Sequence, residues 1–353
     1  MKIEDLIVQP SVWLGNADDS DVIVSSRVRL ARNIRGEAFP HKARVEDSVR
    51  LWERLQSAIC GLPSMDKSMS VEMDSLSWTY RHVLRERHLI SIEQSEKGKG
   101  SGLILKHDES IAIMVNEEDH LRMQALSSGL ALKAIWQKID EVDSELEQNV
   151  NYAFSRRLGY LTACPSNVGT GLRASAMLHL PALNLLNEMG PVIKGLTRIG
   201  LAVRGLLGEG TEASGNMFQI SNQTTLGESE ASIVERLTDV VTEVAGHEKN
   251  ARVRLAEQRK VFLKDYVGRA YGVMVNAHLL SSRELLDLLS AMRLGVDVGI
   301  VRNVSMPLIH ELMLLTQPGH MQMMAKRELS PEERDQMRAQ VTREKFKKLS
   351  IEI

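Results

Sequence analysis

The stretch from Thr162 to Arg173 combines side chains that could hold a phosphorylated ligand. It reads TACPSNVGTGLR, so a cysteine, two glycines and a closing arginine lie within twelve residues. Glycine lets backbone N–H groups approach a ligand closely because it has no Cβ, and arginine grips phosphate or carboxylate through two parallel hydrogen bonds. Alone, this pattern is more typical of an ordinary turn, so its interpretation depends on the stretches that accompany it.

Arginines and carboxylates recur in three other stretches, residues 25–33, 116–122 and 203–215, which read SSRVRLARN, NEEDHLR and VRGLLGEGTEASG. Arg27 and Arg29 alternate with Val28, so an extended backbone turns both guanidinium groups to the same side. Two solvated arginines at a strand edge are the alternative that the pattern alone favours. Arg32 lies close by in the sequence and could share the same basic surface.

Together, these four stretches resemble the phosphagen kinase family, the ATP:guanido phosphotransferases, which move a phosphoryl group between ATP and a guanidinium. The family's CPSNLGTGLR is present with Val168 in place of leucine, and the SSRVR and NEEDHLR elements occur in the family's order. The resemblance covers roughly residues 20–250, and its bacterial protein-arginine kinase branch is the better match. It implies an α+β fold in which helices flank an antiparallel sheet.

Phosphorylation of a guanidinium requires carboxylates, because the group stays protonated, with a pKa above about 12, and must lose a proton as it attacks. Glu117, Glu118 and Asp119 supply candidates, and the resemblance assigns the catalytic role to Glu118 and a second carboxylate to Glu209. Two carboxylates from separate loops could hold the planar guanidinium in line with the γ-phosphate. The resemblance also places Cys164 beside the guanidinium, where arginines and a hydroxyl would lower its pKa. We interpret this cysteine as an orienting group, because the phosphoryl group passes directly to nitrogen.

The resemblance implies a nucleotide site made mainly of arginines. Five match the family's ATP clamp: Arg27, Arg29, Arg122, Arg173 and Arg204. Phosphoryl transfer depends on positioning and on neutralising phosphate charge, and we expect Mg²⁺ to be held mainly through the nucleotide, without protein ligands. Ser25 opens the SSRVR element, and His88 resembles a histidine that packs near the adenine. A histidine at a helix end can instead be a partner of the C-terminal dipole.

Several classes of protein are excluded by the sequence. There is no GxxxxGK[ST] loop and no HRD or DFG element, which argues against P-loop and Ser/Thr kinases. A net charge of −2 argues against a general binder of nucleic acid or membranes. Two cysteines, Cys60 and Cys164, indicate no disulfide framework and favour the cytoplasm. No apolar run has transmembrane length, and the N-terminal residues lack a signal-peptide pattern.

Hydrophobic periodicity predicts helices interleaved with strands. Apolar side chains at helical spacing predict three helices, at residues 44–62, 75–90 and 132–146. Strands are predicted at residues 22–24, 103–106 and 111–115, the last two as a hairpin. Strands among long helices, with a hairpin, favour the α+β class over a doubly wound sheet.

The composition shifts towards charged helices past about residue 250. Residues 251–266, ARVRLAEQRKVFLKDY, are predicted to form one charged helix, and Ser281 and Ser330 each begin a capping box. We therefore divide the chain into a catalytic domain at residues 1–250 and an all-helical C-terminal domain at residues 251–353. The helical domain has no counterpart in small-molecule phosphagen kinases.

Residues 334–339, RDQMRA, match the RDxxRA element that forms an allosteric phosphoarginine pocket in protein-arginine kinases. Arg334 and Arg338 are four residues apart on one predicted helix face, so an anion would relieve their repulsion. The resemblance assigns Arg334, Asp335 and Arg338 to this pocket. The alternative is a solvated helix face on which Asp335 and Glu333 act as partners.

We predict an ATP-dependent protein-arginine kinase. Only 24 residues precede Ser25, too few for the domain that encloses the guanidino substrate of small-molecule kinases, so we expect an open acceptor side. The resemblance implies protein substrates that present arginine, among them a stress-gene repressor, whose phosphorylation marks them for a Clp-type AAA+ protease. It also implies a zinc-binding activator protein, and we expect a homodimer with no direct partner among nucleic acids or membranes.

Two other functions remain as alternatives. One is a free-arginine kinase, and the other is a phosphoarginine-binding adaptor with a degenerate kinase domain. The presence of Glu118, Glu209 and all five clamp arginines counts against the adaptor.

Overall fold

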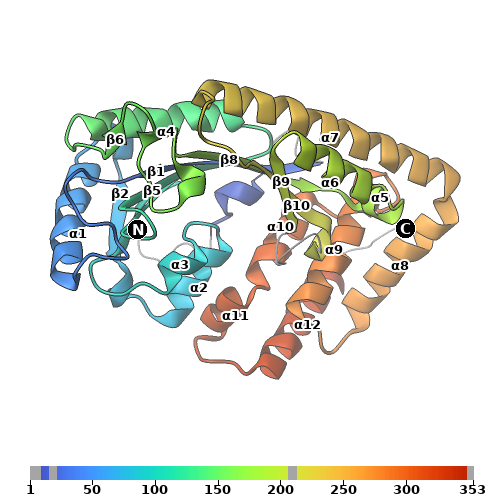
Figure 1. The fold of residues 1–353 in the computed structure, drawn as a ribbon. Helices are drawn as coiled ribbons and strands as arrows, with labels where there is room; N and C mark the ends of the chain where they lie inside the picture. The colour runs from blue at the N-terminus through green and yellow to red at the C-terminus, as the bar shows by residue number, and fades with distance from the viewer. Residues whose placement is uncertain (1–8, 16–21, 206–212, 348–353) are drawn as a thin grey trace. The chain divides into compact units, whose positions relative to one another are not determined.

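The computed structural model describes residues 9–15, 22–205 and 213–347 of the chain. These residues belong to two compact units (Figure 1). The first unit lies within residues 1–13, 25–176 and 221–239, and the second lies within residues 14–24, 177–220 and 240–353. The division that we inferred from composition, at residues 250 and 251, stays a prediction.

The strands of the described residues form an eight-stranded sheet and a small two-stranded one. The large sheet has the order β2-β3-β4-β5-β1-β8-β10-β9. Its strands are β1 (Ile23–Arg32), β2 (Ser68–Glu72), β3 (Gly102–Lys106), β4 (Ile111–Val115), β5 (Leu121–Ser128), β8 (Leu172–His179), β9 (Leu201–Gly205) and β10 (Met217–Asn222). The pairs β1–β5, β2–β3, β3–β4 and β4–β5 are antiparallel, as predicted. Strands β6 (Phe154–Ser155) and β7 (Gly159–Tyr160) make the small sheet.

Strand β8 belongs to both units, because residues 172–176 lie in the first unit and residues 177–179 in the second.

The central strands of the first unit are apolar because they lie in its core. Strand β4 reads IAIMV and is buried throughout, and β3 reads GLILK and is buried up to Lys106. The predicted hairpin is thereby confirmed.

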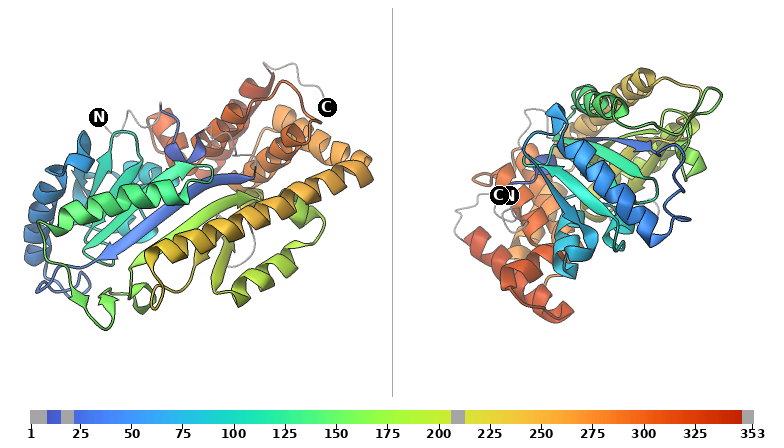
Figure 2. Two further views of the ribbon diagram at one scale, coloured as in Figure 1. Left: turned by 90° about the horizontal axis from the view of Figure 1, so that it is seen from above. Right: turned by 90° about the vertical axis from the view of Figure 1, so that its left-hand side faces the viewer.

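Helices α1 (Val45–Cys60), α2 (Trp78–Glu86), α3 (Ile92–Ser95) and α4 (Leu132–Glu147) belong to the first unit. The stripe predicted for α4 is buried at Leu132, Ile135, Ile139, Val142 and Leu146, and the helix packs on β5 (Figure 2). Helix α2 is shorter than predicted, because the Ser77 side chain caps its first turn by accepting from Tyr80 N at 3.4 Å. At its other end, the chain turns at His88, where φ is +60°.

The second unit is mainly helical. It contains α5 (Pro181–Leu185), α6 (Met189–Arg198), α8 (Lys260–Asn276), α9 (Ser282–Asp297), α10 (Met306–Leu315), α11 (Pro318–Ala325) and α12 (Pro331–Lys347), and most of the long helix α7 (Glu230–Gln258). The predicted capping box at Ser330 is confirmed, because Ser330 and Glu333 bond reciprocally. At Ser281, the cap by the hydroxyl is confirmed, because Ser281 Oγ accepts from Glu284 N.

The single helix predicted at residues 251–266 is wrong. Helix α7 ends at Gln258 and α8 begins at Lys260, with Arg259 between them at φ −132° and ψ 37°. Arginine is neither a usual capping residue nor a helix breaker, so the sequence carries no local signal for this break. Among the described residues, no helix combines the length and the apolarity needed to cross a membrane.

Candidate active site

Neighbouring strands of the first unit bring arginines together. Arg27 and Arg29 alternate along β1, as predicted. Arg122 of β5 lies directly opposite Ala31, and residues opposite one another in an antiparallel pair share a face. Arg122 therefore shares the face of Arg27 and Arg29. Arg173 lies in β8, the neighbour of β1 on its other side, and its charge also reaches Arg29.

Burial and mutual repulsion make this arginine cluster a strong site for an anion. Burial, together with the nearby charge of Arg122, lowers the pKa of Arg27 to about 10. Burial lowers the pKa of Arg29 well below its ordinary value, and the charges of the other three arginines act in the same direction. The Nε of Arg29 is buried and has no hydrogen-bond partner among the described residues. A phosphate group would supply an acceptor for Arg29 Nε and the missing negative charge.

Glu117 is the acidic counterpart of this cluster. Its side chain is 1% exposed and forms an ion pair with Arg122. The Ser91 hydroxyl donates to the same carboxylate oxygen, and the backbone N–H of Glu118 donates to the other oxygen at 2.9 Å. Glu117 therefore neutralises Arg122 and fixes the backbone from which the next side chain projects.

The Glu118 side chain is exposed, in contrast to its neighbours Glu117 and Asp119, which are buried. Burial of part of the carboxyl raises its pKa, the negative charges of those two neighbours raise it further, and Arg122 opposes them. A carboxylate with a raised pKa is a better proton acceptor at neutral pH. Glu118 is thus both accessible to a substrate and suited to take a proton from it.

Asp119 ties the NEEDHLR segment to the loop that carries Cys164. Its Oδ1 accepts from Asn33 Nδ2 at 2.5 Å and from the backbone N of Ala163 at 2.6 Å. The carboxyl is 3% exposed, and burial raises its pKa. Since Ala163 precedes the cysteine directly, this one oxygen fixes the start of the cysteine loop.

The cysteine and Arg173 share a hydroxyl. Cys164 Sγ lies 3.0 Å from Ser166 Oγ, and Arg173 Nη2 donates to the same Oγ at 3.0 Å. Arg173 Nε also donates to Asn167 Oδ1 at 3.1 Å. The loop therefore holds the thiol and the guanidinium in one hydrogen-bonded group. The hydroxyl that the resemblance placed beside the cysteine matches Ser166.

The glycines of this loop serve close backbone packing. Gly169 has φ +117°, and a Cβ built there would lie 2.2 Å from the carbonyl oxygen of Thr225. Gly171 has φ +67°, and its Cβ would lie 2.6 Å from the carbonyl oxygen of Ala31. Their role in the structure is thus to let backbone segments of the first unit meet, a role that the sequence pattern did not separate from ligand approach.

Arg32 does not join the basic surface, which corrects our expectation for it. Its side chain is 1% exposed and forms an ion pair with Asp143 at 2.6 Å. Its guanidinium also lies 3.5 Å from the ring centroid of Tyr160. Arg32 is the eighth and last residue of SSRVRLAR, three residues after Arg29, and this odd spacing turns it away from the face of the cluster.

His88 is held in a strained turn at the edge of this group. Its ring meets Trp13 edge-on at 4.4 Å, and its carbonyl accepts from Gln124 Nε2 at 2.8 Å. Burial, and then the charge of Arg27, lower its pKa to about 3, so the ring is neutral at pH 7. A partner of a helix C-terminus would be favoured as a cation, and a neutral ring does not fit that role; the packing of His88 near a nucleotide base stays a prediction. Ser25, which opens the same strand as Arg27, is 8% exposed.

Other predicted residues lie elsewhere in the chain. Arg204 is an exposed residue of β9 in the second unit, and Glu209 lies outside the described residues. Arg338 of α12 is 1% exposed, and its guanidinium donates to Asp335 and to the carbonyl oxygens of Thr316 and Leu280. Arg334 Nη1 donates to the carbonyl oxygen of Leu329 at 2.8 Å.

Among the described residues, no group of three or more histidine, cysteine or acidic side chains could hold a metal ion. The arginine cluster supplies donors that suit the phosphates of a nucleotide, and the binding of Mg²⁺ stays a prediction.

Comparison with known proteins identifies the family. The chain matches the model of the ATP:guanido phosphotransferase C-terminal catalytic domain over residues 50–251, and that of the protein-arginine kinase McsB C-terminal domain over residues 260–352. A protein-arginine kinase of Moorella thermoacetica is 45% identical over 338 residues, which cover 95% of this chain and 97% of that protein. This chain belongs to the protein-arginine kinase family. The predicted resemblance is confirmed, and the chain is an ATP-dependent phosphotransferase.

Two further comparisons support this assignment. A protein-arginine kinase of Halothermothrix orenii is 42% identical over 343 residues, or 97% of this chain and 98% of that protein. Among solved structures, a lombricine kinase superposes with a TM-score of 0.58 and 25% identity, over 69% of this chain and 70% of that one. The predicted α+β fold with an antiparallel sheet and a helical C-terminal region is thereby confirmed.

The structure also reveals residues that the motifs did not single out. Ser91, Ser166 and Asn167 each contact a charged or thiol group of the site. Glu117 and Asp119, which the sequence offered only as candidate proton acceptors, position the backbone of the site. Ser166 and Asn167 lie inside the CPSN motif, so their polar side chains were a signal in the sequence. Ser91 lies in no motif, and only the fold brings it to Glu117.

Proposed function

We propose that this chain transfers the γ-phosphoryl group of ATP to arginine side chains of proteins. The observation that carries the proposal is the arginine cluster of β1, β5 and β8 beside an accessible carboxylate, in a chain related over 95% of its length to a protein-arginine kinase. Four of its arginines, Arg27, Arg29, Arg122 and Arg173, would hold the phosphates. Arg204, Ser25 and His88 would complete the nucleotide site, with His88 near the base.

The chemistry follows from the charges of the site. A guanidinium nitrogen attacks the γ-phosphorus while the bond from that phosphorus to the β–γ bridging oxygen breaks, and ADP leaves with that electron pair. The proton released by the guanidinium passes to Glu118, whose raised pKa suits it to accept. Mg²⁺, held mainly through the nucleotide, adds neutralising charge on the phosphates when bound.

Other groups would orient the acceptor. Glu209 is proposed as the second carboxylate on the guanidinium, from the resemblance of its segment to the family. Cys164 would touch the guanidinium from the loop that Asp119 and Ser166 hold. Because a planar guanidinium is held in line from two sides, much of the rate would come from positioning.

Regulation and partners are proposed from the same family. From the resemblance of their segment, Arg334, Asp335 and Arg338 are proposed to form a phosphoarginine pocket, in which an incoming anion would compete with Asp335 for the guanidinium of Arg338. A zinc-binding activator, a stress-gene repressor as substrate and a Clp-type AAA+ protease downstream are the proposed partners. A homodimer in the cytoplasm is the proposed state.

The experiment that tests this function compares acceptors. The chain would be incubated with ATP and Mg²⁺ and either an unfolded arginine-rich protein or free arginine, and acid-labile phosphate on nitrogen would be measured. We expect label on the protein and its loss in Glu118→Gln. Label on free arginine alone would favour the small-molecule kinase, and no label on either would favour the non-catalytic adaptor.

A further inference from the structure

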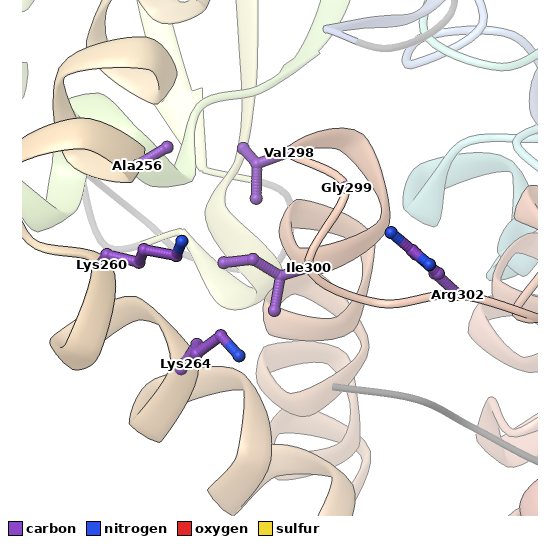
Figure 3. Close-up of a pocket in the computed structure, with 7 residues that line it drawn as sticks. All are labelled: Ala256, Lys260, Lys264, Val298, Gly299, Ile300 and Arg302. Carbon is purple, nitrogen blue, oxygen red and sulfur yellow. The ribbon is translucent and has the colours of Figure 1, made fainter.

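A cavity of about 520 Å³ lies within the second unit, between α8 and the segment that follows α9 (Figure 3). Three basic residues line it: Lys260, Lys264 and Arg302. Its apolar wall is formed by Ala256, Val298 and Ile300. None of these residues belongs to the sites proposed above, so the function assigned to the chain leaves the cavity unexplained.

The cationic lining has no counter-charge. Over the part of the chain that the structure describes, the side chains of Lys260, Lys264 and Arg302 make neither an ion pair nor a hydrogen bond, and the cavity has no acidic residue in its walls. In Figure 3 the two lysine side chains extend from α8 towards Ile300. Lysines four residues apart on a helix repel each other, so this side of the cavity favours a bound anion.

The nearest acidic side chains are engaged or lie outside the cavity. Asp297 ends α9 beside the cavity, but it is paired with Arg252 at 2.9 Å. Asp265, which follows Lys264, is paired with Arg269 at 2.7 Å. Glu257 lines an adjoining cavity that shares only Ala256 and Val298 with this one. The positive charges of Lys260, Lys264 and Arg302 are therefore available to a ligand.

The size and the walls limit what that ligand is. Small-molecule sites typically enclose about 300–1,000 Å³ and combine apolar walls with a few placed polar groups, and this cavity falls within that range. Lysine binds phosphate as a compact charge, and arginine adds a planar donor fork. Lys260 and Lys264 together supply two neighbouring positive charges, which match a phosphate dianion better than a single carboxylate. A concave site in a chain with net charge −2 suits a small molecule better than nucleic acid.

We propose that this cavity is a second binding site of the chain, for a small organic phosphate. The phosphate lies between Lys260 and Lys264, and the organic part lies against Val298 and Ile300 in the direction of Arg302, which Figure 3 shows on the other side of Ile300 from the lysines. The shared chemistry, a phosphate ester or phosphoramidate on a small body, is present both in nucleoside monophosphates and in free phosphoarginine. The test therefore includes both compounds.

Protection of individual lysines from acetylation tests this site directly. The full-length chain would be acetylated with a limiting amine reagent in the presence of AMP, phosphoarginine or inorganic pyrophosphate, with KCl at matched ionic strength as the control. Lys133 and Lys347 are exposed and lie elsewhere, so they serve as internal references. At a ligand concentration of four times Kd, we expect acetylation of Lys260 and Lys264 to slow about fivefold, with no change at the references. The readout is independent of kinase turnover.

Matched variants provide the second measurement. Lys260→Gln/Lys264→Gln and the control Lys133→Gln/Lys347→Gln change the net charge equally, and calorimetric titration with the better organic phosphate compares them. We expect a weak phosphate-dependent site in the control and a Kd raised about tenfold or more in the cavity variant, as for loss of charged contacts. Equal slowing at all four lysines, equal slowing by KCl, or identical isotherms for the two variants would overturn the proposal. Binding of pyrophosphate but of neither organic compound would also overturn it, because the apolar wall would then have no role.

Discussion

Removal of the Asp119 carboxylate should release the cysteine loop, and the structure indicates by how much. One oxygen, Oδ1, accepts both the Asn33 amide and the backbone N–H of Ala163. Asp119→Ala deletes that oxygen and leaves two donors without their acceptor. Asp119→Asn keeps an oxygen that can take the same position, so it is the matched control.

The magnitude follows from the two donors that lose their shared acceptor. A buried donor left unsatisfied costs about 1–3 kcal/mol, so Asp119→Ala should destabilise the first unit by roughly 2–6 kcal/mol. The cost of leaving the Ala163 N–H without its acceptor corresponds to about a 5- to 150-fold increase in the opening of this N–H to exchange. Asp119→Asn should cost much less, because both hydrogen bonds can be kept.

Hydrogen exchange followed by mass spectrometry measures this opening directly in a peptide that contains Ala163 and Cys164. We expect fast exchange in Asp119→Ala, near-normal exchange in Asp119→Asn, and unchanged exchange in α4. Phosphoryl transfer should fall in the alanine variant even at saturating ATP, because the loop no longer holds Cys164. If the alanine variant exchanges like the asparagine variant, Asp119 does not anchor the loop and our argument fails.

Four other outcomes are expected. Glu118→Gln should keep ATP binding but lose about 10²–10⁴-fold in transfer, as for a removed acid–base group, and near-normal turnover would remove Glu118 from its role. Arg173→Ala should weaken both ATP affinity, measured by calorimetry, and the rate, since it removes a bidentate phosphate contact and the partner of Ser166; the assignment is wrong if both are unchanged. Above about pH 6.5, the usual pKa of an unfolded histidine, His88 is neutral in both the folded and the unfolded chain. Between about pH 6.5 and pH 3, only the unfolded chain takes up the proton, because the folded-state pKa is about 3. The free energy of unfolding should therefore fall with falling pH in this range, by at most about 1.4 kcal/mol per pH unit. Denaturant unfolding should show a shallower pH dependence for His88→Gln, and equal slopes would contradict the assignment. Gly171→Ala should destabilise the first unit by more than about 1 kcal/mol, because φ is positive and the new Cβ meets a backbone oxygen; an unchanged denaturation midpoint would argue against this close approach.

The sequence predicted the parts of the site that have local signals. Arg27 and Arg29 alternate with Val28, which is the two-residue period of a strand. The structure has the same alternation because Val28 is buried between the two arginines. The apolar stripe of α4 could be predicted for a similar reason, because burial of one helix face places apolar residues at the helical period in the sequence. The capping boxes at Ser281 and Ser330 were readable because their partners lie three residues away.

The remaining features depend on contacts between residues far apart in the chain. The odd spacing of Arg32 from Arg29 turns it to the other face of the strand, but its burial as an ion pair depends on Asp143, which lies 111 residues later. Ser91 reaches Glu117 across 26 residues. The break at Arg259 has no capping residue to announce it. The roles of the CPSN glycines also depended on which backbone segment each one meets.

The repulsion within the arginine cluster has a consequence for folding itself. The chain gathers four positive charges here, and Glu117 neutralises that of Arg122. When no nucleotide is bound, the remaining repulsion between the arginines opposes folding. Replacing Arg29 by a neutral residue of similar size should therefore raise the melting temperature while it abolishes catalysis, a trade-off between stability and activity. For the same reason, phosphate in a buffer should act as a stabiliser, and melting temperatures of such a protein depend on which anions are present.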